Sequence, residues 1–552
     1  AAASSPPLPS PSWLLPLLIC RLLPRPAEAD RRGGAPVTSS VQPELDPDVW
    51  RPYFGVPPQP KSEGGRGREG AIAYISSLCA LRRKGCILIG WILFISELQI
   101  LMLSVSKPLL SLSPLTAMAI RPPPPRAPTH YAPPHRRTSP FRSAARAAPS
   151  SSTAATAVSL PPSPKKVLVP IAMGTEEMEA VILAGVLRRA GADVTLASVE
   201  DGLEIEASYG TRIIADKPIA ACADQVFDLV AVPGGMPGSV RLRDSEILQR
   251  IMVRQAEEKR LYGAICAAPA VVLMPWGLHK GRKITCHPSF VGDLPTFRAV
   301  ESNVQVSGEL TTSRGPGTAF QFALSFVEQL FGLHAVEDVD STLIDAALER
   351  STEVNRVEWP FDHKPQVLIP IANGSEEMEI IMLVDILRRA NINVVLASVD
   401  ESTNVVGSQR MKIVADKCIL GASDSKYDLI IIPGGPAGAE RLHRSTTLKK
   451  LLKEQKQAGR MYGGISYSPL ILQKQGLLED KTVTAHPSIV SQLTCQVIDS
   501  SKVVIDGNLI TGKGLGTVMD FSLAIVRKFF GHGRAKGVAN GMVFDYPKSR
   551  NA

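Results

Sequence analysis

The sequence feature that most constrains the fold is a long internal repeat. Residues 167–200 read VLVPIAMGTEEMEAVILAGVLRRAGADVTLASVE and residues 367–400 read VLIPIANGSEEMEIIMLVDILRRANINVVLASVD, with 20 of 34 positions identical. The offset of 200 residues persists through a Pro-Gly-Gly segment and becomes 199 after one deletion. A period this long indicates two complete domains rather than a solenoid of short units. Each repeat has about 180 residues, which is enough to bury a core of its own.

Within each repeat, short apolar runs alternate with segments of helical spacing. Residues 167–171, 194–199 and 229–232 are apolar runs typical of buried parallel strands. Residues 176–190 have helical spacing, with acidic residues in the first turn and Arg in the last, as the helix dipole favours. This alternation predicts the α/β class, with a mainly parallel sheet covered by helices on both faces in each repeat. Ligands of such sheets bind beyond the carboxyl ends of the strands.

The excess of positive over negative charge is confined to the first part of the chain. Residues 1–164 contain 18 Lys and Arg against 8 Asp and Glu, whereas the remaining residues contain 43 against 44. A basic surface that binds nucleic acid is therefore not expected on the folded part.

Residues 118–164 have the composition of an organelle-targeting segment. They contain six Arg and no Asp or Glu, and they are rich in Ser, Ala and Pro. Arg-rich and Ser-rich N-termini without acidic residues are typical of transit peptides. The many Pro residues favour a chloroplast over a mitochondrion. We therefore expect a start at Met118, a transit peptide over 118–164 and a location in the chloroplast stroma; a plain disordered tail is the alternative.

The first 117 residues resemble no compact domain, and we interpret them as disordered or as translated sequence upstream of the true start. An apolar run at 86–105 approaches the length of a bilayer span. It contains Glu97 and Gln99, so we expect no membrane segment in the mature protein. The expected organisation is a first domain at 165–345, a linker at 346–364, a second domain at 365–545 and a tail at 546–552.

The eight cysteines show no pattern of a metal site or a disulfide framework. No CxxC spacing and no Cys/His cluster occurs. The sequence therefore predicts free thiols in a reducing compartment, with no metal and no cofactor.

Cys266 lies where an apolar strand runs directly into a helix. Residues 263–269, GAICAAP, place small residues on both sides of the turn, which is the arrangement of a nucleophile elbow. A thiol at this turn faces the N-terminus of the following helix, whose dipole is expected to lower the pKa. A buried structural cysteine is the alternative.

Two further residues are candidates for proton transfer beside Cys266. Glu179 follows the first strand, and a carboxyl buried beside a thiolate is expected to have a raised pKa, to donate a hydrogen bond to the sulfur and to shuttle protons. His287 follows a later strand and is a candidate base or substrate-orienting group, with a loop histidine bonded to backbone as the alternative. We interpret Glu176 and Glu177 as charges that stabilise a helix N-terminus.

Five ordered motifs carry a resemblance to a known family. GTEEMEA, PGGMPG, ICAAPA, ITCHPS and TSRGPGTAFQFALSFVEQLFG together resemble the DJ-1/PfpI family, and its DJ-1-like branch most closely. The resemblance covers about residues 165–545. The tandem form with a plastid leader is similar to the plant members, and the segment at 275–278 is most similar to the homologue C subgroup.

The resemblance implies a flavodoxin-like sandwich for each repeat and no cofactor. It implies that Cys266 is an oxidisable nucleophile, that Glu179 is its protonated partner and that His287 lines the pocket. The backbone at Gly234 and Gly235 would form an oxyanion hole. It further implies glyoxalase activity without a cofactor, from methylglyoxal to lactate, with a role in oxidative stress. Family members pair through the first helix, so we expect an internal pair of domains or a homodimer.

The second repeat departs from this pattern at the nucleophile. Its elbow has Ser466 in place of Cys266, and a serine hydroxyl needs an adjacent base to react. A serine hydrolase with His486 as the base is a minor alternative to a degenerate structural half. Gly185 also stands where the second repeat has Asp385, so the surface of the first helix differs between the repeats. The predicted degenerate site comprises Ser466, Glu379, His486, Gly434 and Gly435.

Two functions remain open at this point. The first is a glyoxalase-type lyase or hydrolase at Cys266, with a small dicarbonyl as substrate. The second is a non-catalytic redox sensor or scaffold needed for chloroplast development, because oxidation of a thiol needs the same thiolate character. A Cys-His protease is disfavoured because Ala267 stands where the peptidase branch has a His.

Overall fold

The computed structural model describes residues 163–343, 351–359 and 362–546. The predicted leader, the predicted transit peptide, the apolar run at 86–105 and most of the predicted tail lie outside these residues. None of the described helices is long and apolar enough to cross a membrane.

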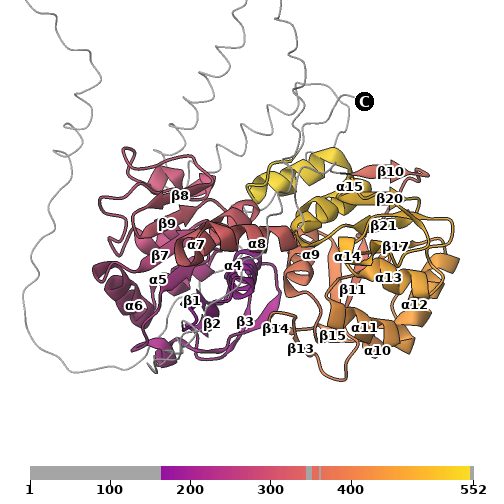
Figure 1. The fold of residues 1–552 in the computed structure, drawn as a ribbon, viewed down its shortest axis with the longest axis horizontal. Helices are drawn as coiled ribbons and strands as arrows, with labels where there is room; N and C mark the ends of the chain where they lie inside the picture. The colour runs from indigo at the N-terminus through magenta and orange to yellow at the C-terminus, as the bar shows by residue number, and fades with distance from the viewer. Residues whose placement is uncertain (1–162, 344–350, 360–361, 547–552) are drawn as a thin grey trace, which may run out of the picture. The chain divides into compact units, whose positions relative to one another are not determined.

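The first domain alternates strands and helices as its sequence pattern predicts (Figure 1). Its strands are β1 (Lys166–Ile171), β2 (Asp193–Ser198), β3 (Glu204–Glu206), β4 (Arg212–Ile214), β5 (Lys217–Pro218), β6 (Leu229–Val232), β7 (Leu261–Ile265), β8 (Val304–Ser307) and β9 (Leu310–Ser313). Its helices are α4 (Glu177–Arg189), α5 (Gly238–Arg243), α6 (Glu246–Glu257), α7 (Ala319–Phe331) and α8 (Leu333–Leu343). Shorter helical turns are η4 (Ile219–Cys222), η5 (Pro269–Leu273), η6 (Pro288–Asp293) and η7 (Pro316–Thr318).

The second domain repeats this order. Its strands are β10 (Thr352–Val354), β11 (Gln366–Ile371), β12 (Asn393–Ser398), β13 (Asn404–Val406), β14 (Lys412–Val414), β15 (Lys417–Cys418), β16 (Leu429–Ile432), β17 (Met461–Ile465), β18 (Thr482–Val483), β19 (Gln496–Val497), β20 (Val503–Asp506) and β21 (Leu509–Gly512). Its helices are α9 (Glu377–Arg389), α10 (Ile419–Ala422), α11 (Pro436–Arg444), α12 (Thr446–Gln457), α13 (Ser468–Lys474), α14 (Pro487–Val490), η8 (Leu515–Thr517) and α15 (Val518–Gly541).

Each domain is built on a mainly parallel sheet. The strand order in the first domain is β5-β2-β1-β6-β7-β9-β8, and β8 runs antiparallel to β9. The run β2-β1-β6-β7-β9 is the 2-1-3-4-5 order of flavodoxin-like sheets, and β12-β11-β16-β17-β21 repeats it in the second domain. The predicted fold class, two flavodoxin-like α/β sandwiches in tandem, is therefore confirmed.

Part of the segment that the sequence analysis assigned to the linker belongs to the second domain. Thr352–Val354 forms β10, which pairs in parallel with β20 at the edge of the second sheet. Trp359 packs against Phe529 with ring centroids 5.6 Å apart and is buried. This correction arises because a three-residue edge strand in a polar stretch gives no periodic signal.

The two domains share one apolar core. Helices α4 and α7 cover one face of the first sheet, and α9 and α15 cover the corresponding face of the second sheet. These four helices meet, and their buried side chains form a single cluster that includes both sheets. The opposite faces, under α5 and α6 in the first domain and under α11 and α12 in the second, have separate cores.

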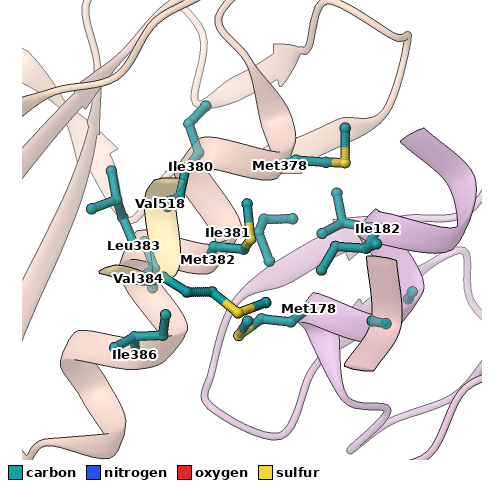
Figure 2. Packing of buried hydrophobic residues seen from close by; sticks show 14 of the residues in the cluster. Met178, Ile182, Met378, Ile380, Ile381, Met382, Leu383, Val384, Ile386 and Val518 are labelled. Atoms are coloured by element: carbon teal, nitrogen blue, oxygen red, sulfur yellow. The ribbon is translucent and has the colours of Figure 1, made fainter. Parts of the chain in front are cut away.

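Helices α4 and α9 pack directly against each other at the centre of this core. Met178 and Ile182 of α4 face side chains of α9, among them Met378 and Met382 (Figure 2). A Cβ atom on Gly185 would lie 2.7 Å from the sulfur of Met378. The absence of a side chain at Gly185 therefore creates the space that Met378 fills.

A small antiparallel sheet also crosses between the domains. Strands β4 and β14 pair with Ile213 opposite Ile413, which joins the hairpins β3-β4 and β13-β14 into one four-stranded sheet. Backbone hydrogen bonds thus reinforce the contact between α4 and α9.

Met378→Ala tests the importance of the shared core. Met378 is fully buried, so we expect the substitution to reduce the free energy of unfolding by about 2–5 kcal/mol, through lost apolar contact and a residual cavity. Leu420→Ala is the control, because Leu420 is 71% exposed and its loss should change stability by less than about 0.5 kcal/mol. Equal effects of the two substitutions in urea denaturation would contradict the shared core.

Candidate active site

The elbow at Cys266 is the centre of the candidate site. Cys266 follows β7 and has φ of 64°, in the left-handed region that non-glycine residues rarely adopt. Its N–H donates to the carbonyl of Ser313 at 3.1 Å, which ties the elbow to the end of β9. The chain thus turns sharply at the carboxyl edge of the sheet, as the elbow motif predicts.

Glu179 lies directly beside the thiol of Cys266. Its Oε2 accepts a hydrogen bond from the N–H of Gly234 at 2.7 Å. A Cβ atom on Gly234 would lie 2.6 Å from the Cβ of Cys266 and 3.0 Å from Glu179 Oε2, so only glycine permits this approach. Oε1 of Glu179 has no hydrogen-bond partner among the described residues, and the side chain of Cys266 acts to lower the pKa of the Glu179 carboxyl.

The proton of this pair resides mainly on sulfur. Burial raises the pKa of Glu179 to about 7, while the Gly234 N–H and the thiol act to lower it. Burial, followed by the negative charges of Glu179 and Glu176, raises the pKa of Cys266 well above its ordinary value. The thiol is therefore the hydrogen-bond donor, and near neutral pH Glu179 is partly ionised and able to accept a proton.

The raised pKa of Glu179 agrees with the sequence analysis, but the predicted low-pKa thiolate was wrong. The predicted stabilising dipole is weak, because the turn that follows the elbow is only the five-residue π-helix η5. The site is also buried and surrounded by acidic groups, both of which disfavour a second negative charge.

Gly234 and Gly235 do not present two open donors in this state. The N–H of Gly234 is occupied by Glu179, and the N–H of Gly235 faces the sulfur of Cys266, where it acts to lower the pKa of the thiol. The predicted oxyanion hole is therefore reduced to Gly235 unless Glu179 moves away from Gly234.

His287 adjoins the elbow, but its ring is held by backbone groups. Its own N–H donates to the carbonyl of Cys266 at 2.8 Å. Nδ1 accepts from the N–H of Ser289 at 3.2 Å, and Nε2 lies 3.4 Å from the carbonyl of Gly541 in the second domain. Burial lowers the pKa of His287 to about 4. The structure thus favours the alternative of a neutral, backbone-bonded histidine over a base acting on Cys266.

The second elbow keeps the geometry of the first without its nucleophile. Ser466 has φ of 57°, and its hydroxyl donates to Glu379. Burial raises the pKa of Glu379 to about 8. Nδ1 of His486 accepts a backbone N–H at 3.2 Å, and the His486 ring stacks on Tyr467 with centroids 4.9 Å apart. The hydroxyl of Ser466 is thus bonded to a carboxyl instead of to His486, which argues against the serine hydrolase alternative.

A group of charged residues that the sequence patterns did not predict reaches the first site from the second domain. Arg389 of α9 forms ion pairs with Glu176 and with Asp385 of its own helix. The Oε2 of Glu176 in turn accepts the N–H of Glu179 at 2.7 Å. No spacing along the chain indicates this network, because it forms only when α4 packs against α9.

A cavity of about 550 Å³ lies between the two domains, and none of Cys266, Glu179 and Arg389 is among its lining residues. Its lining includes Arg314 and Phe320 from the first domain and Met519 and Asn540 from the second. It is large enough for a small molecule. In the part of the chain that the structure describes, no group of three or more His, Cys, Asp or Glu is arranged to hold a metal ion.

Comparison with known proteins agrees with the family resemblance that the sequence motifs carry. A family model described as the DJ-1/PfpI family matches residues 165–329 and 365–528. Protein DJ-1 homolog B of Arabidopsis thaliana is 45% identical over 382 residues, which cover 68% of this chain and 87% of that protein. Protein DJ-1 homolog A of the same plant is 44% identical over 378 residues, which cover 67% of this chain and 96% of that protein. The glutathione-independent glyoxalase DJR-1.2 of Caenorhabditis elegans is 35% identical over 160 residues, which cover 28% of this chain and 83% of that protein.

Glu179→Gln tests the protonation of the buried carboxyl. The ordinary pKa of Glu is 4.5, and in the folded chain Glu179 has a pKa of about 7, so folding takes up a proton between these values. The stabilisation that this bound proton gives to the folded state is complete below pH 4.5. It is lost as the pH rises through 7. In urea denaturation of the wild type, we expect the free energy of unfolding to fall between pH 5 and pH 8. In Glu179→Gln this fall should be smaller by roughly 1–3 kcal/mol.

The exposed Glu257 provides the control for this titration, because Glu257→Gln changes an acidic residue outside the site. Wild type and Glu179→Gln curves that run parallel across this pH range would show that Glu179 does not titrate as described.

Proposed function

Because the chain belongs to the DJ-1/PfpI family, we propose that it is a glutathione-independent glyoxalase that converts methylglyoxal to lactate at Cys266. The observation that carries this proposal is the contact between the Cys266 thiol and a carboxyl, Glu179, whose pKa is about 7. Such a carboxyl accepts and returns protons at neutral pH. The relative from C. elegans, which is named a glutathione-independent glyoxalase, supports the same reaction.

The first step is addition of sulfur to the aldehyde carbon. Glu179 accepts the thiol proton as the S–C bond forms, so the raised pKa of Cys266 does not require a standing thiolate. The N–H of Gly235, which faces the sulfur, lies close to the new alkoxide and stabilises its charge. Glu179 then passes its proton to the alkoxide, which gives a neutral hemithioacetal.

The second stage converts the hemithioacetal to a lactoyl thioester. The hydrogen on the former aldehyde carbon moves to the neighbouring carbonyl carbon, and Glu179 relays it as a proton through an enediol. Water then attacks the thioester, the C–S bond breaks and lactate leaves with the thiol restored. Atoms balance as methylglyoxal plus water giving lactic acid, with no external oxidant or reductant.

The burial of the site limits what can react. Cys266 is 1% exposed, and its neighbours include Glu179 and the backbone of Gly234 and Gly235. These surroundings favour a substrate of a few heavy atoms, such as a small dicarbonyl, over a protein side chain. They also disfavour the alternative of a redox sensor, because oxidation of cysteine follows exposure and thiolate character.

Cys266→Ser in the full-length chain tests the proposal. We expect wild type to consume methylglyoxal without glutathione and to release lactate, and Cys266→Ser to lose at least about 100-fold in kcat/KM, since the nucleophile is removed. Ser466→Ala is the matched control and should retain wild-type turnover, because Ser466 occupies the second elbow.

No turnover by folded wild type would refute the enzyme and leave the non-catalytic scaffold or redox role in chloroplast development. Equal losses in the Cys266 and Ser466 variants would show that stability rather than chemistry limits the assay.

We further propose that the protein acts in the chloroplast stroma, which the acid-free, Arg-rich composition of residues 118–164 supports. A fluorescent protein that carries this segment at its N-terminus should accumulate inside chloroplasts of plant cells and lose the segment. The same segment with its six Arg changed to Glu should stay in the cytosol. Cytosolic fluorescence from the unaltered segment would contradict the location.

A further inference from the structure

The first turns of α4 and α9 differ at one hydrogen bond. The side chain of Glu176 caps α4 by accepting the N–H of Glu179 at 2.7 Å. Glu376, at the same position in the second repeat, makes no such cap. Instead, its Oε2 accepts from Ser408 at 2.7 Å, and its Oε1 has no partner among the described residues. The cap is therefore present beside the elbow that holds a cysteine and absent beside the elbow that holds a serine.

The guanidinium of Arg389 fixes the capping carboxyl from the other domain. It donates to Glu176, to both carboxylate oxygens of Asp385 and to the hydroxyl of Tyr209, which lies 3.0 Å away. Its central carbon lies 4.0 Å from the centroid of the Tyr209 ring. The side chains of Arg389 and Glu176 are 5% and 4% exposed. Four hydrogen bonds thus hold the guanidinium in place, and Glu176 has little freedom to leave the cap.

The mirror-image arrangement is incomplete. Arg189 of α4 pairs with Glu376 of the second domain at 2.7 Å. Its carboxylate neighbour is missing, because Gly185 stands where α9 has Asp385, and Arg189 bonds to the Gly185 carbonyl instead, at 3.2 Å. The arginine that contacts the cysteine site therefore has a carboxylate neighbour, Asp385. The arginine that contacts the serine site has none, because Gly185 stands at that position.

We propose that Asp385 and Arg389 of the second domain are positioning residues for Cys266, because they hold Glu176 where it caps α4 and fixes Glu179 beside the thiol. The second domain, without a nucleophile of its own, thus completes the reactive site of the first. This positioning role affects the reactivity of the Cys266 thiol. It rests on the proposed function only where a change in that reactivity is expected to change the turnover of methylglyoxal.

The charges around the network give the direction of the effect. Asp385 acts to raise the pKa values of Glu176 and Glu179, and negative charge on these two carboxyls raises the pKa of Cys266. Loss of the Asp385 charge therefore leaves both carboxyls more ionised and the thiol harder to ionise. The titratable and charged groups that face the network include Glu176, Glu177, Glu179, Cys266, Tyr209, His287, Asp385 and Arg389.

The experiment measures alkylation of Cys266 by iodoacetamide between pH 6 and pH 11, with mass spectrometry of the peptide that contains it. The full-length chain is used, and no dicarbonyl is present. In Asp385→Asn the reaction profile should move to higher pH by roughly 0.5–1 unit, a loss of about three- to tenfold in rate below the midpoint. In Glu176→Gln the profile should move to lower pH, because Gln keeps a capping oxygen but carries no charge.

The matched control is Glu376→Gln, which makes the same change at the mirror position and should leave the Cys266 profile unchanged. The double variant of Glu176→Gln and Asp385→Asn should cancel most of the upward shift, since Asp385 acts through the carboxyl that the first change neutralises.

Profiles of folded Asp385→Asn and Glu176→Gln that superpose on wild type would overturn the proposal. If Asp385→Asn does not fold by thermal melting, the downward shift in Glu176→Gln still decides the matter. If neither variant folds, the network is a determinant of folding rather than of thiol reactivity, and the proposal fails. Because alkylation needs no turnover, absence of glyoxalase activity leaves this test intact.

Discussion

The packing of α4 against α9 is the contact on which the rest of the structure depends. Each helix is buried along nearly its whole length, so neither domain can present its sheet face to water without exposing a wide apolar surface. The same contact carries charged ends into the interior, where Arg389 meets Glu176. Buried charges are tolerated only when they are paired and hydrogen-bonded, and the helix contact supplies those partners from the opposite domain.

The candidate site illustrates how burial decides where a proton resides. A cysteine at a sharp strand-to-helix turn is usually expected to be a thiolate, but Cys266 is enclosed by carboxyls and by backbone. The proton stays on sulfur, and Glu179 becomes the group whose pKa lies near neutrality. Reactivity then depends on transfer of a proton within the pair rather than on a preformed anion.

The sequence predicts those parts of the molecule that are encoded locally. The apolar runs become β1, β2 and β6 almost residue for residue, and the elbow and Glu179 meet because strand ends converge at one edge of a parallel sheet. By contrast, one partner of the His287 ring, the carbonyl of Gly541, is 254 residues away. Such contacts depend on how the two domains pack against each other, and no local sequence pattern predicts that packing.

The strand pairing between β4 and β14 has a consequence for how the assembly of the site depends on protein concentration. Two separate chains that build one site together lose it on dilution, because association depends on concentration. Here the halves are segments of one polypeptide, so the local concentration of each for the other is set by the connection between them and not by expression level. Covalent linkage also frees each half to diverge, since a substitution in one is no longer repeated by symmetry in the other.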